Sequence, residues 1–476
     1  MAHCITPRKN SACKRRRQQP DVRLRFILAV ASACALLPGK LQAENAYSSS
    51  RFDSTAWSRY PEKPFAISAE ANPLPPGEFN GENTGVERAS AEINAGDEVS
   101  SIPRRFQYAF RLNLRAVYDD NIYLRHTDRV GDYYFAIEPG VTIGFGDIVG
   151  RNQNSIRLDY APSIFIYGDN SDSNGIQHLI HLEGHYHFSR LALSLSQRVQ
   201  LLEGDNQSVN FGTTTGGNTG PAFNLDAGGE TQVNIYTTQV NFSYDLTGKT
   251  FLSGGASYTA NDYEELISNE TVSANLYLNY NYSPKLVVGL GGSAGYNWVG
   301  GTNPDQMFEQ INVRLGYQIS GKVTLDASGG VEFRQFEDNL RGGSYVSPVY
   351  ELGATYMPFD GTSVTLRGSR RTMNSAVLLA QNYASTNITV GLRQRFFQRV
   401  YVGLSAGYEN SDYFGTVEFV ESTRSDNYFF LQPAVDLTLT RFWTVGVYYL
   451  YRQNDSSTEL TSFYDNQFGV RTSLTF

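Results

Sequence analysis

Arginines recur on one side of a series of segments in which apolar and polar residues alternate. Guanidinium groups gathered around a pore favour anions and the acidic groups of sugars. The candidates for such a constriction are Arg111, Arg115, Arg157, Arg314, Arg367 and Arg393. Carboxylates on the same side include Glu138, Asp159, Glu183, Asp326, Glu332, Glu351 and Asp436. The alternative is a self-neutralising network of arginine and carboxylate side chains that braces a wall.

Histidines are concentrated in one segment. His178, His181, His185 and His187 are four of the six in the chain, and three of them share a side with Glu183. Along a strand that rises about 3.3 Å per residue, positions four apart are separated by about 13 Å. Only His185 and His187 could therefore share a metal ion. We predict that these imidazoles line a polar surface, with no metal or other cofactor.

Acidic loops and serines offer two further kinds of chemistry. Asp119, Asp120 and Asn121 with Asp128, or the group at 169–172, could supply oxygen ligands to calcium, although the EF-hand spacing is absent. Solvated turns are the plainer interpretation. A hydrolase would need a serine or an aspartate beside a histidine. After residue 43, the chain has only one histidine besides the four just named, His126. We predict a protein that is not an enzyme, with a barrel hydrolase as an alternative.

Alternation with period two dominates the chain from Arg105 onward and predicts β-strands. Near the C-terminus, Trp443, Val445 and Val447 fall on one face, whereas Thr444 and Gly446 fall on the other. About 18 such segments follow one another, with 16 as the alternative, and short turns alternate with long polar loops. One apolar face with aromatic residues near both ends is typical of a membrane-spanning strand. We therefore predict an all-β fold, a transmembrane antiparallel up-and-down β-barrel, over residues 105–476.

Composition is consistent with this fold. Hydrophobic residues make up 41% of the chain and the mean hydropathy is −0.35, as for many soluble proteins. A transmembrane barrel has the same low hydropathy because only alternate residues face lipid. A soluble β-solenoid or a large sandwich is the alternative, but neither requires regularly alternating long and short connections.

The N-terminal part of the chain has a different character. A basic cluster at 14–17 precedes an apolar run from Phe26 to Leu37, and small residues lie before Glu44. This pattern predicts a signal peptide over 1–43. Lipidation at Cys34 is the alternative, although the residues before this cysteine match the lipobox motif poorly. Residues 44–104 lack sustained alternation, which favours a periplasmic, mostly disordered extension. A small plug inside the lumen is the alternative for this segment.

The net charge and the positions of the cysteines argue against a nucleic-acid-binding protein and against disulfide or thiol chemistry. The three cysteines, Cys4, Cys13 and Cys34, lie within 1–43, so the mature chain is expected to have no disulfide or thiol chemistry. Residues 1–43 hold nine basic side chains and one acidic side chain, and the whole chain has a net charge of −8. The mature chain would therefore carry −16, which argues against nucleic acid as a partner.

One stretch resembles a known family. Tyr118-Asp-Asp-Asn-Ile-Tyr123, then Asp132, Ile137-Glu-Pro-Gly-Val141 and Gly146-Asp147, is similar to the β-barrel porin 2 family of outer-membrane proteins. The match is clearest over the first two predicted strands. It implies an outer-membrane barrel without catalytic residues. Some members are associated with exopolysaccharide or exosortase gene clusters, so the resemblance suggests polysaccharide as a cargo.

These observations predict a porin-like channel in the bacterial outer membrane, for passive diffusion or export of small solutes or polysaccharide. Its surroundings would be outer-membrane lipid and lipopolysaccharide. The first alternative is a structural or assembly protein whose lumen is plugged and which binds a periplasmic protein through residues 44–104. The sequence does not specify the oligomeric state, the pore diameter or the cargo.

Overall fold

The computed structural model describes residues 106–146, 154–203, 226, 232–301, 303–337, 343–359, 361–417 and 424–476. The predicted signal peptide 1–43 and the predicted extension 44–104 lie outside these residues.

Eighteen β-strands make up most of the described residues. In chain order they are β1 (Phe106–Asp119), β2 (Asp132–Gly146), β3 (Ser155–Tyr167), β4 (Gly175–His187), β5 (Leu191–Leu202), β6 (Val233–Asp245), β7 (Thr250–Tyr263), β8 (Asn269–Ser283), β9 (Leu286–Val299), β10 (Asp305–Ser320), β11 (Val323–Glu337), β12 (Ser344–Tyr356), β13 (Thr362–Asn374), β14 (Gln381–Phe396), β15 (Val400–Gly415), β16 (Ser425–Thr440), β17 (Trp443–Ser456) and β18 (Phe463–Thr475). Two short 3-10 helices, η2 (Ser171–Ser173) and η3 (Glu459–Thr461), lie in connections. Within the described part of the chain, no helix is long and apolar enough to cross a membrane.

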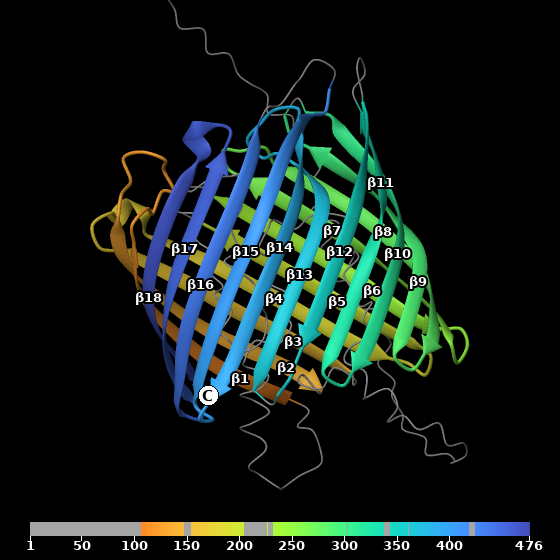
Figure 1. The fold of residues 1–476 in the computed structure, drawn as a ribbon, viewed down its shortest axis with the longest axis horizontal. Helices are drawn as coiled ribbons and strands as arrows, with labels where there is room; N and C mark the ends of the chain where they lie inside the picture. Colours follow the sequence, from red (N-terminus) through yellow and green to blue (C-terminus); the bar gives the residue numbers. More distant parts are fainter. Residues whose placement is uncertain are drawn as a thin grey trace, which may run out of the picture. The chain divides into compact units, whose positions relative to one another are not determined.

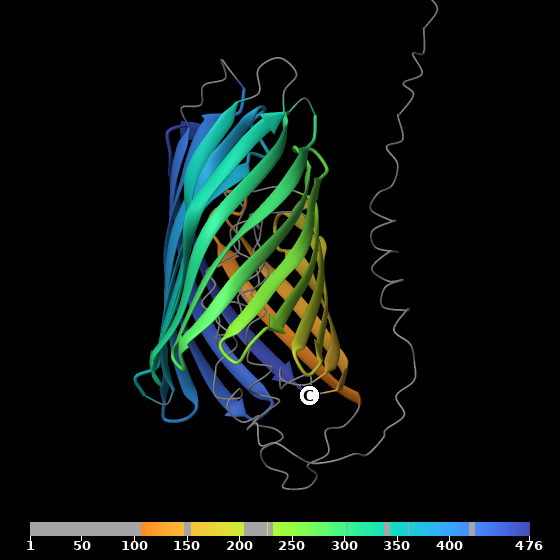
Figure 2. The same ribbon diagram turned by 90° about the vertical axis from the view of Figure 1, so that its right-hand side faces the viewer.

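The sheet closes on itself. Each strand pairs in antiparallel fashion with its neighbours in the chain, and β1 also pairs with β18. In that closing pair, Arg111 to Asp119 lie opposite Thr475 to Gln467. Figure 1 and Figure 2 show the slanted strands surrounding an interior. The predicted all-β antiparallel barrel of 18 strands is confirmed.

The two ends of the barrel differ in their connections. Turns such as Pro284–Lys285 between β8 and β9 lie at one end, which we call the turn end. Phe476 is also at this end, where its backbone N–H donates to the carbonyl of Phe110 (2.8 Å). Longer connections, such as residues 120–131 between β1 and β2, lie at the opposite end, which we call the loop end.

The outer face of the barrel is apolar, and aromatic side chains lie near both ends. Tyr133 near the loop end and Phe145 near the turn end of β2 are 51% and 57% exposed. Twelve residues separate them, which is about 40 Å along a strand and about 30 Å along the barrel axis at a tilt near 45°. This spacing matches the hydrocarbon thickness of a bilayer, so the outer face is suited to contact with lipid.

Candidate functional site

The inner face of the barrel is polar and is the candidate functional site. Buried polar side chains at inward positions include Thr142, Gln177, Asn279, Asn312, Glu332 and Ser411. They alternate along each strand with the exposed apolar residues of the outer face, as the period of a strand requires. The predicted arginines fall on this inner face, and their contacts decide which of them could meet a solute.

Two of the predicted arginines are paired with carboxylates on neighbouring strands. Arg115 on β1 is only 5% exposed, and its Nε donates to Glu138 Oε1 on β2 at 3.0 Å. On β3, the Nε of Arg157 donates to Asp159 at 2.8 Å, and its Nη2 lies 3.3 Å from Glu183 on β4. This part of the wall has the form of the self-neutralising network that the sequence offered as an alternative.

Arg111 lies on the same strands as these pairs, whereas Arg314 lies on β10. The side chain of Arg111 on β1 lies across Gly140 of β2, where a Cβ atom would collide with it. Arg314 on β10 is 4% exposed, and its guanidinium donates to the neutral side chain of Asn279 at 2.8 and 3.0 Å. It also donates to Ser253 and lies 3.9 Å from the centre of the Tyr277 ring.

The last two candidates, Arg367 on β13 and Arg393 on β14, lie on adjacent strands, and the Arg393 guanidinium lies 4.4 Å from the Tyr401 ring centre. The six arginines therefore occupy three separate sectors of the wall: β1–β3, β10 and β13–β14. Burial leaves Arg115 and Arg314 little contact with solvent, whereas Arg111, Arg157, Arg367 and Arg393 are partly exposed. A pore-lining role stays a prediction for all six, and their exposure makes these four the better placed to contact a solute.

The histidines of β4 do not converge. Glu183 Oε1 lies 2.8 Å from His185 Nε2, and His181 Nε2 lies 3.0 Å from Ser196 Oγ on β5. His178 is on the opposite face, where its ring stacks on Tyr160. The carboxylate of Glu183 thus contacts His185 and does not orient the His181–Ser196 pair. Among the residues that the structure describes, no third group of the kind used in a hydrolytic triad is hydrogen-bonded to this pair.

Two stretches of the sequence match the pattern G-x-S-x-G of a hydrolase nucleophile. They are Gly291 to Gly295 and Gly403 to Gly407, and they lie within β9 and β15. The nucleophile elbow of a hydrolase is instead a sharp turn between a strand and a helix. The pattern in this chain therefore reflects the small residues of barrel strands.

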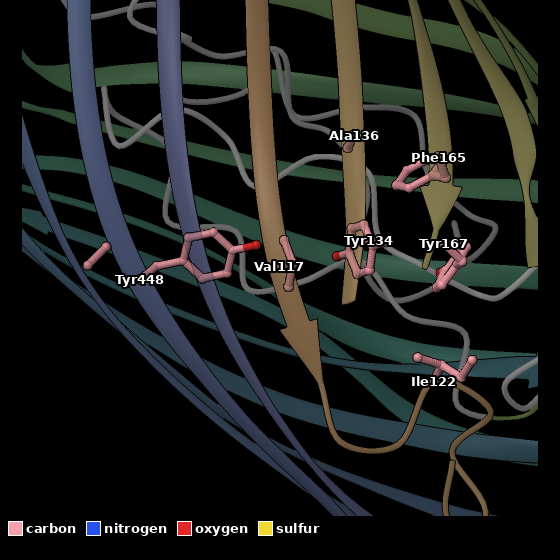
Figure 3. Close-up of a cluster of buried hydrophobic side chains, with 8 residues drawn as sticks. Val117, Ile122, Tyr134, Ala136, Phe165, Tyr167 and Tyr448 are labelled. Carbon is pink, nitrogen blue, oxygen red and sulfur yellow. The ribbon is translucent and has the colours of Figure 1, made fainter. Parts of the chain in front are cut away.

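The connection between β1 and β2 folds into the mouth of the barrel. The sequence placed it outside as a solvated loop, but Asn121 and Ile122 are completely buried. Ile122 packs among inward-facing side chains of β1–β3, including Tyr134 and Tyr167 (Figure 3). Residues 121–124 of this connection are thus internal, because Ile122 and Leu124 find a buried surface on the inner wall, whereas residues 125–128 are exposed.

The same segment also contacts the other side of the β1–β18 junction. Leu124 packs against Tyr428, Phe430, Leu450 and Phe463 on β16–β18. The amide of Asn121 donates to the carbonyls of Arg125 (2.9 Å) and Tyr464 (3.0 Å), which fixes the turn. Leu124 itself has a φ of 52°, a left-handed conformation that is rare for a leucine and is held by these contacts. Residues 121–124 therefore narrow the loop end over the inner faces of these strands.

Acidic side chains beside this segment form an internal network. Asp119, Asp120 and Asp465 place one carboxylate oxygen each within 4.8 Å of one another, whereas Asp128 is exposed and outside the group. The Nε of Arg452 donates to Asp465, and Arg129 lies 3.3 Å from Asp120. Asp119 and Asp120, two of the residues considered as calcium ligands, thus belong to a network that also contains arginines.

The loop-end parts of β13 and β14 form an inner layer against β9–β11. Leu366 and Ile388 are exposed on the outer face of these strands, but Asn374 and Asn382, at positions of the same parity, contact inward-facing side chains. Asn382 and Gln306 of β10 exchange two hydrogen bonds (2.9 and 3.0 Å). The amide of Asn297 on β9 donates to Asn374 at 3.2 Å. The strand ends have therefore bent into the lumen.

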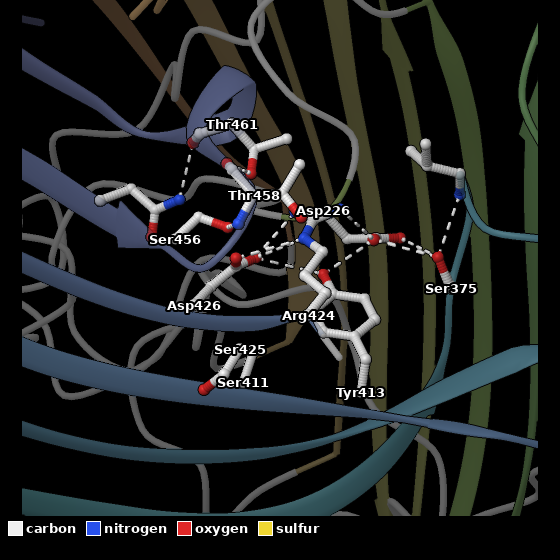
Figure 4. Close-up of polar contacts among 12 residues, drawn as sticks. Asp226, Ser375, Ser411, Tyr413, Arg424, Ser425, Asp426, Ser456, Thr458 and Thr461 are labelled. Carbon is white, nitrogen blue, oxygen red and sulfur yellow. Dashed lines mark hydrogen bonds and ion pairs between the residues drawn. The ribbon is translucent and has the colours of Figure 1, made fainter. Parts of the chain in front are cut away.

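Asp226, in the connection between β5 and β6, is held at this inner layer. Its carboxylate accepts hydrogen bonds from Ser375 Oγ (3.0 Å), the Ala376 N–H (2.5 Å) and Tyr413 Oη (2.9 Å). Arg424 lies 3.7 Å away and forms a hydrogen-bonded ion pair with Asp426 (Figure 4). A residue that follows β5 thus binds at β13–β16, on a distant part of the wall.

Acidification is expected to strengthen this contact. Burial raises the pKa of Asp226 above its ordinary value, although Arg424 and the hydrogen-bond donors oppose the shift. An acid whose pKa is higher in the docked state than in the free state contributes stability at low pH and loses it as the pH rises through the raised pKa. The temperature at which the folded barrel loses its gel-mobility shift should therefore rise on acidification. Asp226→Asn should flatten this dependence, and an unchanged pH profile in that variant would contradict the assignment.

The sequence indicated the inward packing of residues 121–124 but not the contacts of Asp226. Ile122 and Leu124 are apolar residues inside a polar loop, which is a detectable hint of burial. Asp226 lies in a long stretch rich in glycine, threonine and asparagine, and nothing in that composition marks it. Its role depends on Ser375, Tyr413 and Arg424, which are far away in the sequence.

Closed strand pairing, an apolar exterior and a polar interior define this chain as a transmembrane-type β-barrel. No protein-family model and no curated protein sequence matches it. The resemblance to the β-barrel porin 2 family therefore stays a prediction.

Several solved structures are similar at low sequence identity. OccAB3 of Acinetobacter baumannii has a TM-score of 0.40 and 11% identity, with 78% of this chain and 99% of that chain covered. OpdK of Pseudomonas aeruginosa has a TM-score of 0.39, 11% identity and coverage of 78% and 99%. The FrpB iron transporter of Neisseria meningitidis has a TM-score of 0.41, 7% identity and coverage of 81% and 83%. Such scores and identities indicate no function for this chain.

Proposed function

We propose that this chain is a porin-like channel of the bacterial outer membrane, which carries small solutes or polysaccharide by passive diffusion or export. The observation that carries the proposal is a closed strand cylinder whose outer face is apolar and whose inner face is polar. In a bilayer, a closed barrel satisfies all strand hydrogen bonds and encloses a polar path. The turn end would face the periplasm and the loop end the exterior.

The resemblance of residues 118–147 to the β-barrel porin 2 family supports polysaccharide as a cargo. The partly exposed Arg111, Arg157, Arg367 and Arg393 are the side chains that could contact an acidic solute. A further proposal is that residues 44–104 form a periplasmic extension that follows a cleaved signal peptide.

A second candidate function is a structural or assembly protein with a blocked lumen. The observation that favours it is the inward packing of residues 121–124 and of the loop ends of β13 and β14. In this role, the barrel would anchor a periplasmic partner, and residues 44–104 would bind it.

Single-channel recording separates the two functions. Purified mature protein in planar bilayers is expected to give discrete conductance steps, both with residues 44–104 and after their removal. Current that is seen only after the removal would identify that segment as a plug. Absence of current in both forms, with the barrel shown to be folded by its heat-dependent shift in gel mobility, would reject the channel.

A further inference from the structure

Six turns at the turn end of the barrel each carry a basic side chain. They connect β4 to β5, β6 to β7, β8 to β9, β10 to β11, β14 to β15 and β16 to β17. All six side chains are exposed, and within the described part of the chain no carboxylate forms an ion pair with any of them. We call this set the basic rim: Arg190, Lys249, Lys285, Lys322, Arg399 and Arg441.

The backbone places five of these residues at equivalent positions. The carbonyl of Lys285 accepts a hydrogen bond from the N–H of Gln318 on β10 at 2.8 Å. The carbonyls of Arg190, Lys249, Lys322 and Arg399 each accept the same kind of bond from the adjoining hairpin, at 2.7–2.9 Å. Strands about 4.8 Å apart and tilted by about 45° occupy about 14 Å of circumference per hairpin. Basic groups therefore recur about every 14 Å along most of the rim.

The turn between β12 and β13 interrupts this series. It has no basic residue of its own, but the Nζ of Lys322 donates to the carbonyl of Pro358 in that turn at 2.6 Å. The ammonium group of Lys322 thus extends along the rim toward the next basic residue, Arg399. The positive charge is distributed over the turns from β4 to β17.

An acidic segment precedes the first strand. Residues 70–98 lie outside the described residues, but their sequence contains seven carboxylates and one basic side chain, Arg88, which gives a net charge of −6. Five of the carboxylates recur at intervals of four or five residues: Glu78, Glu82, Glu87, Glu92 and Asp97. In an extended chain that rises about 3.3 Å per residue, these intervals are about 13–17 Å. The spacing of these acidic side chains therefore matches that of the basic rim.

The covalent chain brings this segment to the same end of the barrel. β1 begins at Phe106, opposite Phe145 near the turn end of β2. Glu98 precedes Phe106 by eight residues, which span at most about 28 Å when extended. Binding within one chain acts at an effective concentration that reaches about millimolar. A single exposed ion pair is weak, but several pairs on one tethered segment act together.

We propose that residues 70–98 bind along the basic rim, so that successive carboxylates of the segment pair with the basic side chains of successive turns. The occupant of this surface is therefore a part of the same chain. The segment follows the circumference of the turn end and leaves the lumen open. The proposal consequently requires neither a conducting lumen nor a blocked one.

Carbodiimide cross-linking of the mature protein in a neutral detergent tests this contact. The reagent joins a lysine amine to a carboxylate only where the two groups touch. Peptide mass spectrometry should find Lys249, Lys285 or Lys322 joined to carboxylates of residues 70–98. The yield should fall severalfold between about 0.1 M and about 1 M NaCl, because the Debye length falls from about 10 Å to about 3 Å. Acetylation of the same lysines by an active ester confirms that their amines are reactive.

Variants of the rim arginines leave the cross-linked lysines in place. Arg399→Gln should lower the yield about twofold, and the triple variant Arg190→Gln, Arg399→Gln and Arg441→Gln should lower it about fivefold, because half of the positive charges of the rim are then lost. Arg125→Gln is the matched control for Arg399→Gln, since it removes one exposed charge from the loop end. Its yield should equal that of the unaltered protein. The gel-mobility shift shows that each variant is folded.

Three results would overturn the proposal. One is the absence of cross-links between these lysines and residues 70–98 while the lysines remain reactive. The second is a yield that is the same in Arg399→Gln and in Arg125→Gln. The third is a rim that acts only on passing anions, seen as an altered anion-to-cation permeability in the triple variant without any cross-link to the segment. Because cross-linking needs no current, its failure is distinguishable from a failure of the channel.

Discussion

Leu124→Asp should increase the single-channel conductance severalfold. Leu124 is 7% exposed and packs against aromatic and aliphatic side chains of β16–β18 at the loop end. A carboxylate placed in that apolar cluster would lose its hydration, which costs several kcal/mol for a charge that is not well paired. The segment 121–124 should therefore leave the inner wall, and the mouth of the barrel should widen.

Leu460→Asp is the matched control for this experiment. It introduces the same charge at the same end of the barrel, but Leu460 is 84% exposed, so no buried contact is lost. Its conductance should stay close to that of the unaltered protein. If both variants had the same conductance, the added charge and not the position of the segment would be responsible. Conductance unchanged in Leu124→Asp would mean that this segment does not restrict the pore.

Arg115→Met should lower the free energy of unfolding of the barrel by about 3–5 kcal/mol, the usual cost of breaking a buried ion pair from one side. Arg115 and Glu138 are joined through Nε at 3.0 Å, and their side chains are 4% and 12% exposed. The single substitution leaves the Glu138 carboxylate buried without its cation. Urea unfolding in lipid vesicles, followed by the gel-mobility shift, measures the difference.

The double variant Arg115→Met with Glu138→Leu separates the cost of an orphaned charge from the loss of packing. Removing both charges leaves no buried ion, so most of the lost stability should return. If the double variant were as unstable as the single one, the pair would contribute through packing and not through electrostatics. A loss below about 1 kcal/mol in the single variant would indicate a solvated pair instead.

Many of the arginines in the sequence lie on the inner wall and are held there by neighbouring side chains. Arg115 and Arg157 are braced by carboxylates on adjacent strands, and Arg314 is held by Asn279 and Ser253. Such pairs could not be assigned from the sequence, because alternation places a residue on a face but does not give the register between strands. The register is fixed by backbone pairing, which for instance places Arg115 opposite Ala136, two residues along β2 from Glu138.

The sequence by itself determined the barrel. Each strand is specified locally, by alternation over a dozen residues and by a turn or polar loop at each end. About 18 strands could therefore be predicted before any contact was known, with 16 as the alternative, and the structure has 18. The lipid-facing and inward-facing sides follow from the same period, because successive side chains point to opposite faces.

Only the tertiary structure decided what occupies the loop end. Asn382 of β14 has the parity of a lipid-facing residue, yet it binds Gln306 inside the barrel because the strand end bends inward. Ile122 and Asp226 are in connections without periodicity, and each is held by partners that the closed barrel brings near it. Local patterns report which way a side chain points relative to its own strand, but a bend is stabilised by contacts between residues far apart in the chain. Those contacts exist only after the wall has closed.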